Sequence, residues 1–170
     1  MAIKYARENK IPYLGLCYGM QLASVEFARN VLGIKKAHTI EFDEKSPDLI
    51  IHINEKQAKN VTGNRFGGTM RLGAYDCDLK EGTKVRKLYA TKHISERHRH
   101  RYEFNNDYRE RLEKAGMHIA GVNKKSDLVE IIELKNHPFF IGTQFHPELK
   151  SRPLRPHPLF IGLVKAILKK

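Results

Sequence analysis

The sequence predicts an α/β fold: a mixed, mostly parallel β-sheet flanked by helices, in a three-layer, flavodoxin-like arrangement. Two observations lead to this class. Early in the chain, short apolar runs alternate with segments of helical period, which is typical of a parallel sheet. Late in the chain, apolar runs at 128–134 and 139–145 are joined by Lys135-Asn136-His137-Pro138, a connection short enough for a hairpin.

The first half of the chain carries the alternating elements. A helical pattern over 2–8 is followed by a short apolar run at 13–16, which predicts a buried strand. A second helix starts directly after this strand and ends near Gly33. Its apolar face comprises Leu22, Val25, Ala28, Val31 and Leu32. The next segments are a loop at 41–43, a strand over 48–53, a polar stretch over 55–62 and a glycine-bounded strand over 67–73.

The second half predicts mainly strands between short helices. Asn106 or Asp107 is expected to cap a helix over 108–114, which Gly116 ends. The other expected elements are a helix at 85–89, a basic extended segment at 93–104, strands at 117–122, 128–134 and 139–145, and a helix striped from Leu159 to Leu168 behind the proline-rich 153–158.

Bulk properties indicate one globular domain over residues 1–170. The formal net charge of +12 is unusual, and a lysine-rich solvated surface explains it more simply than a nucleic-acid or membrane partner. The longest uncharged run, 11–25, is too short to span a bilayer. Two distant cysteines argue against a disulfide scaffold, so we expect a cytoplasmic protein.

The stretch Gly15-Leu16-Cys17-Tyr18-Gly19 lies where the first predicted strand turns into a helix. A sharp strand-to-helix turn presents a nucleophile on strained backbone, and flanking glycines let the crossing chain pass. The turn also places the sulfur at a helix N-terminus, whose dipole favours the thiolate. By itself this pattern is equally typical of a structural cysteine in a tight turn.

A possible base for Cys17 lies near the other end of the chain. The strand predicted at 139–145 runs directly into His146-Pro147-Glu148. In extended chain, residues two apart point the same way, so Glu148 can hold the imidazole of His146 in one tautomer. A cysteine nucleophile usually works with such an oriented histidine.

These motifs resemble a known family. Pro-Tyr-Leu-Gly-Leu-Cys-Tyr-Gly-Met-Gln at 12–21, together with Gln-Phe-His-Pro-Glu at 144–148, is similar to the class I glutamine amidotransferases. Within them the chain resembles the glutaminase domain of the CTP synthase family. That narrower resemblance rests on the stretches 25–30, 67–73, 96–103 and 151–160, and it covers nearly the whole chain.

The resemblance implies a triad of Cys17, His146 and Glu148 that hydrolyses glutamine through a γ-glutamyl thioester. The backbone N–H of Tyr18 would form half of an oxyanion hole. The family more often has an aliphatic residue at that position, so we expect the Tyr18 side chain to reshape the pocket. The implied contacts to glutamine are Tyr18, Gly19, Met20, Gln21, Glu41 and Arg101. An arginine suits the α-carboxylate and a carboxylate suits the α-ammonium.

The resemblance also implies partners. In complete members of the family, ammonia passes to a synthetase domain that aminates UTP with Mg-ATP, GTP activates glutamine hydrolysis, and the enzyme is a homotetramer. The glutaminase portion needs no metal or organic cofactor of its own. Strands and a glycine-rich oxyanion loop that precede this region in the family have no counterpart here, so we expect a partial, N-terminally truncated domain.

Other interpretations stay open. Another class I amidotransferase or a γ-glutamyl hydrolase would share the Cys17 turn and the His-x-Glu motif, and a catalytically incomplete fragment would act only as a binding or assembly module. The arginine–histidine alternation over 96–101 suggests phosphate or metal binding. Aromatic residues are few there, however, and no third ligand accompanies His98 and His100. We expect Cys77 to be a buried thiol.

Overall fold

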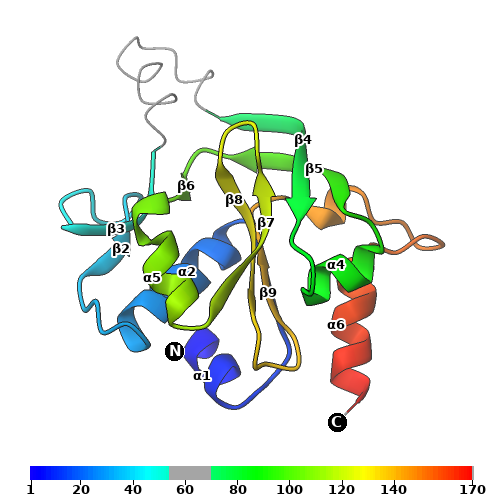
Figure 1. Cartoon of the computed structure of the whole chain (residues 1–170), viewed down its shortest axis with the longest axis horizontal. Coiled ribbons are helices and arrows are strands. Elements are labelled where there is room, and N and C mark those ends of the chain that lie inside the picture. The colour runs from blue at the N-terminus through cyan, green and yellow to red at the C-terminus, as the bar shows by residue number, and fades with distance from the viewer. Residues whose placement is uncertain (54–69, 170) are drawn as a thin grey trace.

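The structure is a computed structural model that describes residues 1–53 and 70–169. A six-stranded sheet in the order β1-β9-β8-β7-β4-β5 is its main element (Figure 1). Its strands are β1 (Tyr13–Leu16), β4 (Arg71–Leu79), β5 (His93–His100), β7 (Met117–Asn123), β8 (Leu128–Leu134) and β9 (Phe140–Thr143). A smaller sheet in the order β2-β3-β6 consists of β2 (Ala37–Thr39), β3 (Asp48–His52) and β6 (Glu103–Phe104).

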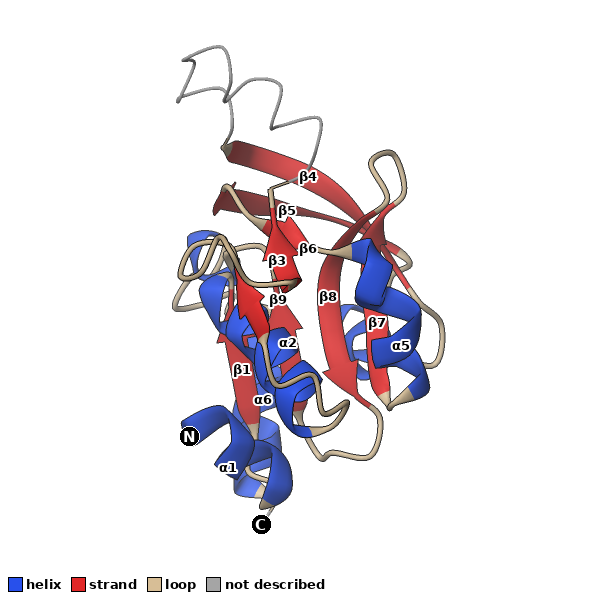
Figure 2. Cartoon of the chain, turned by 90° about the vertical axis from the view of Figure 1, so that its left-hand side faces the viewer, coloured by secondary structure: helices blue, strands red, loops and turns tan. Residues whose placement is uncertain are grey.

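Helices cover both faces of the main sheet. On one side lie α1, α2 and α5, and on the other lie α4 and α6 (Figure 1); Figure 2 views the molecule from the side of α2 and α5. The helices are α1 (Ala2–Glu8), α2 (Tyr18–Asn30), α4 (Lys84–Tyr89), α5 (Arg109–Lys114) and α6 (Pro158–Leu168), with the 3₁₀ turns η2 (Asn106–Tyr108) and η3 (Pro147–Leu149). None of the described helices is long and apolar enough to cross a membrane.

Two hydrophobic cores follow from this arrangement. One contains Met20 of α2 with Ile132 of β8, and the other contains Leu159 of α6 with Ile131 of β8. Ile131 and Ile132 point to opposite cores because successive side chains of a strand face opposite sides of a sheet. Every residue of β8 is buried, since helices cover both faces. The predicted three-layer α/β arrangement is confirmed.

The prediction of a mostly parallel sheet is wrong for the strands that the structure describes. In the main sheet only β1 and β9 pair in parallel, whereas β8–β9, β7–β8, β4–β7 and β4–β5 are antiparallel. The β7–β8 and β8–β9 connections are too short for a parallel crossover, which needs a dozen or more residues. The hairpin-like joint predicted before 139–145 is therefore confirmed, and it makes the sheet mixed.

Most predicted elements are present, with local differences. The side chain that caps the turn before α5 is Asn105, which accepts from the Asp107 N–H at 3.0 Å, so the predicted cap at Asn106 or Asp107 is wrong. The strand β2 was not predicted, because three residues carry too little pattern. The stretch 55–62 and residues 67–69 lie outside the described residues. The strand expected to end at Gly73 continues to Leu79.

Of the two glycines that flank Cys17, only Gly15 is required by close packing. A Cβ on Gly15 would lie 2.5 Å from the Tyr13 hydroxyl and 2.7 Å from the carbonyl carbon of Gly19. A Cβ on Gly19 would meet only the Tyr13 hydroxyl, at 3.4 Å, outside the backbone of its own helix. The expectation that both glycines are needed is thus right for Gly15 alone.

We predict that Gly15→Ala lowers the free energy of unfolding by about 1–3 kcal/mol, because the Gly19 backbone must move. Gly19→Ala is the matched control: it adds the same methyl group to the same turn and should be neutral or stabilising by up to about 1 kcal/mol. Urea unfolding of both variants measures the difference. Equal effects of the two substitutions would contradict this account of the turn.

Candidate active site

Cys17 occupies the turn between β1 and α2 with φ 49° and ψ −100°. Such left-handed backbone costs about 1–3 kcal/mol and persists only where surrounding contacts impose it. The Cys17 N–H donates to the Thr143 carbonyl at 2.6 Å, and the Tyr13 hydroxyl donates to the Gly19 carbonyl at 2.8 Å. The strained strand-to-helix turn predicted from the sequence is therefore present.

The pairing of β1 with β9 brings the two ends of the chain together. Leu16 lies opposite Thr143 in this parallel pair. Carboxyl ends of parallel strands meet at the same edge of a sheet, which is where α/β proteins place their sites. Cys17 follows β1 directly, and His146 lies just beyond the end of β9. The nucleophile and the base predicted from distant motifs thus share one edge of the sheet.

His146 and Glu148 form the predicted pair. The Nδ1 atom of His146 lies 2.6 Å from a carboxylate oxygen of Glu148. The expected extended geometry is wrong, because β9 ends at Thr143 and Pro147 begins the 3₁₀ turn η3, which is the position in a turn that proline favours. The His146 N–H donates to the Arg97 carbonyl at 2.8 Å, which ties this turn to β5.

The contact with Glu148 selects a tautomer of His146. When Nδ1 donates to the carboxylate, Nε2 carries the lone pair that a base needs. This Nε2 atom is buried and has no hydrogen-bond partner among the described residues. Thr143 and Phe145, by contrast, use their polar groups within the protein, since the Thr143 hydroxyl donates to the Phe145 carbonyl. Among the described residues, the Nε2 atom of His146 is therefore not engaged by another polar group.

Burial dominates the electrostatics of the Cys17 sulfur. It raises the pKa of the thiol to about 11, and the carboxylates of Glu148 and Glu103 add to the rise. The Tyr18 N–H and the Gln144 side chain lower the pKa by hydrogen bonding, but by less. Desolvation therefore outweighs the stabilisation of the thiolate that was expected from the helix N-terminus. Cys17 rests as a thiol and needs a base to remove its proton.

We predict that alkylation of Cys17 by iodoacetamide is slow at pH 7 and rises about tenfold per pH unit between pH 7 and 9, because only the thiolate reacts and a thiol pKa near 11 lies above this range. Mass spectrometry after timed quenching measures the rate, and Cys17→Ser identifies the labelled peptide. A rate that is already constant below pH 8 would contradict the protonated resting state.

A cavity of about 340 Å³ opens beside Cys17 and gathers most of the predicted substrate contacts. Of these, Tyr18, Gln21, Glu41 and Arg101 line it, whereas Gly19 and Met20 do not. The Met20 side chain is fully buried in the core. The lining residues are Cys17, Tyr18, Gln21, Glu41, Met70, Arg99, His100, Arg101 and Tyr102.

The segment 99–102 supplies polar groups that sequence reasoning only partly identified. The Nε atom of Arg101 is buried without a hydrogen-bond partner in the described part of the chain, as expected of a group that waits for a carboxylate. His100 donates from Nδ1 to the Tyr102 carbonyl at 3.1 Å. Burial, reinforced by the positive charge of Arg71, lowers the pKa of His100 to about 2. His100 is therefore neutral in the pocket wall.

The basic stretch on β5 is mainly structural. Glu96, His98 and His100 point inward, while Arg97 and Arg99 are exposed. The Nε2 atom of His98 lies 2.8 Å from Glu130, and its Nδ1 atom faces the carbonyl of Glu96 at 3.0 Å. Within residues 1–53 and 70–169, no three acidic, histidine or cysteine side chains are placed to hold a metal ion. The phosphate and metal interpretations of this stretch gain no support.

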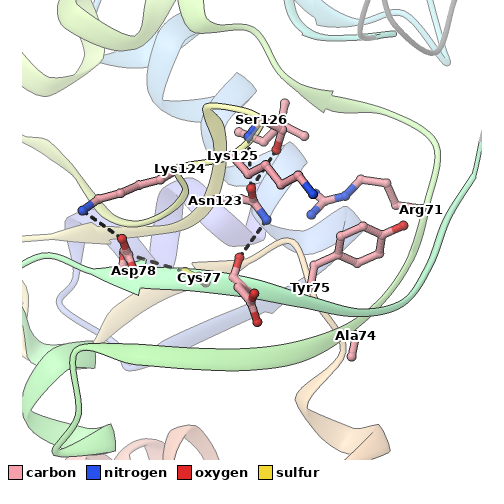
Figure 3. Close-up of a pocket in the computed structure, with 11 residues that line it drawn as sticks. Arg71, Ala74, Tyr75, Cys77, Asp78, Asn123, Lys124, Lys125 and Ser126 are labelled. Carbon is pink, nitrogen blue, oxygen red and sulfur yellow. Dashed lines mark hydrogen bonds and ion pairs between the residues drawn. The ribbon is translucent and has the colours of Figure 1, made fainter.

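A larger cavity, of about 640 Å³, lies away from Cys17 between β4 and the turn after β7 (Figure 3). Two of its cations are already paired, since Lys124 lies 2.9 Å from Asp78 and Arg71 lies 2.7 Å from Glu130. Cys77 lies in its wall and is 1% exposed, and burial raises the pKa of this thiol. Cys77 is thus the buried thiol that was predicted.

Comparison with known proteins defines the class. Residues 1–166 match the family model described as "Glutamine amidotransferase class-I". The chain therefore belongs to the class I glutamine amidotransferases.

The more specific relatives are CTP synthases. The chain is 59% identical to the CTP synthase of Caldanaerobacter subterraneus subsp. tengcongensis over 98% of its own length, and 58% identical to that of Fibrobacter succinogenes over 99%. In both cases it spans 30% of the relative. A solved structure, the glutaminase domain of Trypanosoma brucei CTPS with bound acivicin, matches 99% of this chain and 64% of that one, with a TM-score of 0.91 and 38% identity.

Proposed function

We propose that this chain hydrolyses L-glutamine as the glutaminase portion of a CTP synthase. The observation that carries the proposal is that the strained Cys17 turn and the hydrogen-bonded His146–Glu148 pair lie at the same edge of the sheet, with a cavity beside Cys17 that Glu41 and Arg101 line. The high identity to proteins named CTP synthase selects this member of the class over another class I amidotransferase or a γ-glutamyl hydrolase.

The proposed reaction has two stages. The Nε2 atom of His146 takes the thiol proton while the Cys17 sulfur attacks the side-chain amide carbon of glutamine. The backbone N–H of Tyr18 stabilises the oxyanion. His146 then returns the proton to the departing nitrogen, the C–N bond breaks, and ammonia leaves a γ-glutamyl thioester. A water molecule, deprotonated by His146, hydrolyses the thioester, and glutamate and the Cys17 thiol are released.

The cavity fits an amino-acid substrate. Glu41 and Arg101 both line it, so a carboxylate and a guanidinium are available for the α-ammonium and the α-carboxylate of glutamine. Tyr18 also lines the cavity, and we expect its side chain to influence the shape of the pocket. No metal or organic cofactor takes part in these steps.

We further propose that the ammonia is used by a synthetase domain of the same enzyme, which phosphorylates the 4-oxygen of UTP with Mg-ATP and lets ammonia displace phosphate to give CTP. The chain spans 30% of its curated relatives, and a synthetase domain would be the principal partner. The homotetramer, the activation by GTP and the cytoplasmic location implied by the family belong to this wider proposal.

Labelling with a glutamine-mimicking diazo-ketone tests the glutaminase site. We predict an adduct on Cys17, detected by mass spectrometry, that is suppressed by glutamine and lost in Cys17→Ala. It should be reduced about 10²–10⁴-fold in rate in His146→Ala, because the general base is removed. An adduct on Cys77 instead would overturn the assignment. A folded chain without any adduct would favour the binding or assembly module.

Glu148→Gln tests the third member of the triad. We predict a loss of roughly 10²–10⁴-fold in the rate of glutamate release, because the amide no longer holds the His146 tautomer or stabilises the imidazolium. Glu44→Gln is the control, since it removes the same charge from an exposed loop residue. A Glu148→Gln enzyme as fast as the Glu44→Gln enzyme would exclude this carboxylate from the mechanism.

A further inference from the structure

Among the described residues, the side chain of Gln144 lies within hydrogen-bonding distance of the Cys17 sulfur. The Nε2 atom of Gln144 lies 3.7 Å from the Sγ atom of Cys17. Gln144 is completely buried and lies directly after β9, with its backbone N–H donating to the Glu130 carbonyl at 2.8 Å. A buried amide held by the sheet has little freedom to turn away from the sulfur.

The direction of this amide is determined by a neighbouring one. The Nε2 atom of Gln21 lies 3.1 Å from the Tyr102 carbonyl, which can only accept, so Nε2 of Gln21 is correctly placed as a donor. The same Nε2 donates to Oε1 of Gln144 at 3.3 Å. With Oε1 facing Gln21, the NH₂ group of Gln144 must face Cys17. The side-chain amides of Gln21 and Gln144 thus form a continuous chain of hydrogen bonds between the Tyr102 carbonyl and the Cys17 sulfur.

We propose that Gln144 is a further catalytic residue of this glutaminase site, whose side-chain N–H stabilises the Cys17 sulfur as it loses its proton, and that Gln21 positions it. This inference rests on the proposed function. It also revises the expected role of Gln21: both hydrogens of its amide are engaged by Tyr102 and Gln144, so only its Oε1 atom is left to meet glutamine.

The surroundings of the sulfur make such a donor necessary. Burial and the carboxylates of Glu148 and Glu103 all oppose a negative charge on Cys17, whereas the hydrogen bonds from Gln144 and from the Tyr18 N–H favour it. The cation formed on His146 offsets the charge once the proton has moved. The other charged or titratable side chains of the cavity wall are Glu41, Arg99, His100 and Arg101, with the hydroxyls of Tyr18 and Tyr102.

Alkylation of Cys17 by iodoacetamide, followed from pH 7 to 10 by mass spectrometry, tests the role of Gln144. Gln144→Met keeps the length of the side chain but removes the donor, and the rate should fall about tenfold at each pH. Gln144→Glu keeps the acceptor for Gln21 and adds a negative charge, so its rate should fall further. Gln21→Met, which leaves the Gln144 amide unoriented, should cause a smaller loss.

A matched control separates this effect from a packing defect. Ser24→Ala removes another buried hydrogen bond on α2, from the Ser24 hydroxyl to the Met20 carbonyl, and should leave the rate unchanged. The bulkier reagent N-ethylmaleimide should show the same loss factor in each Gln144 variant, because loss of thiolate is independent of reagent size. Unchanged rates in folded Gln144→Met and Gln144→Glu, or factors that grow with reagent size, would overturn the proposal.

A second measurement uses the protein without changes at Gln144. In ¹⁵N spectra, the side-chain NH₂ signals of Gln144 should shift in Cys17→Ala, which removes the acceptor, and stay in place in Cys77→Ala. Unmoved signals in Cys17→Ala would also overturn the proposal. Neither test needs glutamine, so a chain that fails the diazo-ketone test but passes these would lose the proposed function and keep the role of Gln144 toward the thiol.

Discussion

The parallel pairing of β1 with β9 is the constraint on which the rest of the site depends. It places the Thr143 carbonyl to accept from the Cys17 N–H, and this contact holds the nucleophile in left-handed backbone. The chain leaves the sheet at the end of β9 and reaches His146 directly afterwards. Helix α2 packs closely against β9, since a Cβ on Gly142 would lie 3.0 Å from the Cβ of Met20. This close packing helps to hold β9 in its place beside β1. Any shift of β9 would therefore move the nucleophile and the base together.

Burial has two consequences at this site. It keeps the Cys17 thiol protonated and His100 neutral, so the cavity at rest holds fewer charges than its residue types suggest. It also removes water, which strengthens each hydrogen bond and charge inside the cavity. The catalytic problem is then the transfer of one proton to His146, and the groups that touch the sulfur decide how readily that occurs. This explains why a neutral amide, Gln144, can matter beside a charged triad.

Much of the local structure was predictable because its signals are short-range. The apolar run 13–16, the helix at 2–8 and the strand at 128–134 each lie where periodicity indicates. Alternating elements wrongly predicted a mostly parallel sheet, since the short connections on either side of β8 impose antiparallel pairing. The cap at Asn105 was also missed, because several side chains at 105–107 are equally suited to a cap, and packing selects among them.

By itself, the sequence determined the nucleophile turn, the His146–Glu148 pair and the family, because spacing and residue type over a few positions are sufficient for these. The tertiary structure decided which groups meet in space. It paired β1 with β9, assembled the cavity from α2, the loop at Glu41 and the segment 99–102, and turned Gln144 toward the sulfur. It also decided the charge states, since desolvation depends on what packs around a group and leaves no mark in the local sequence.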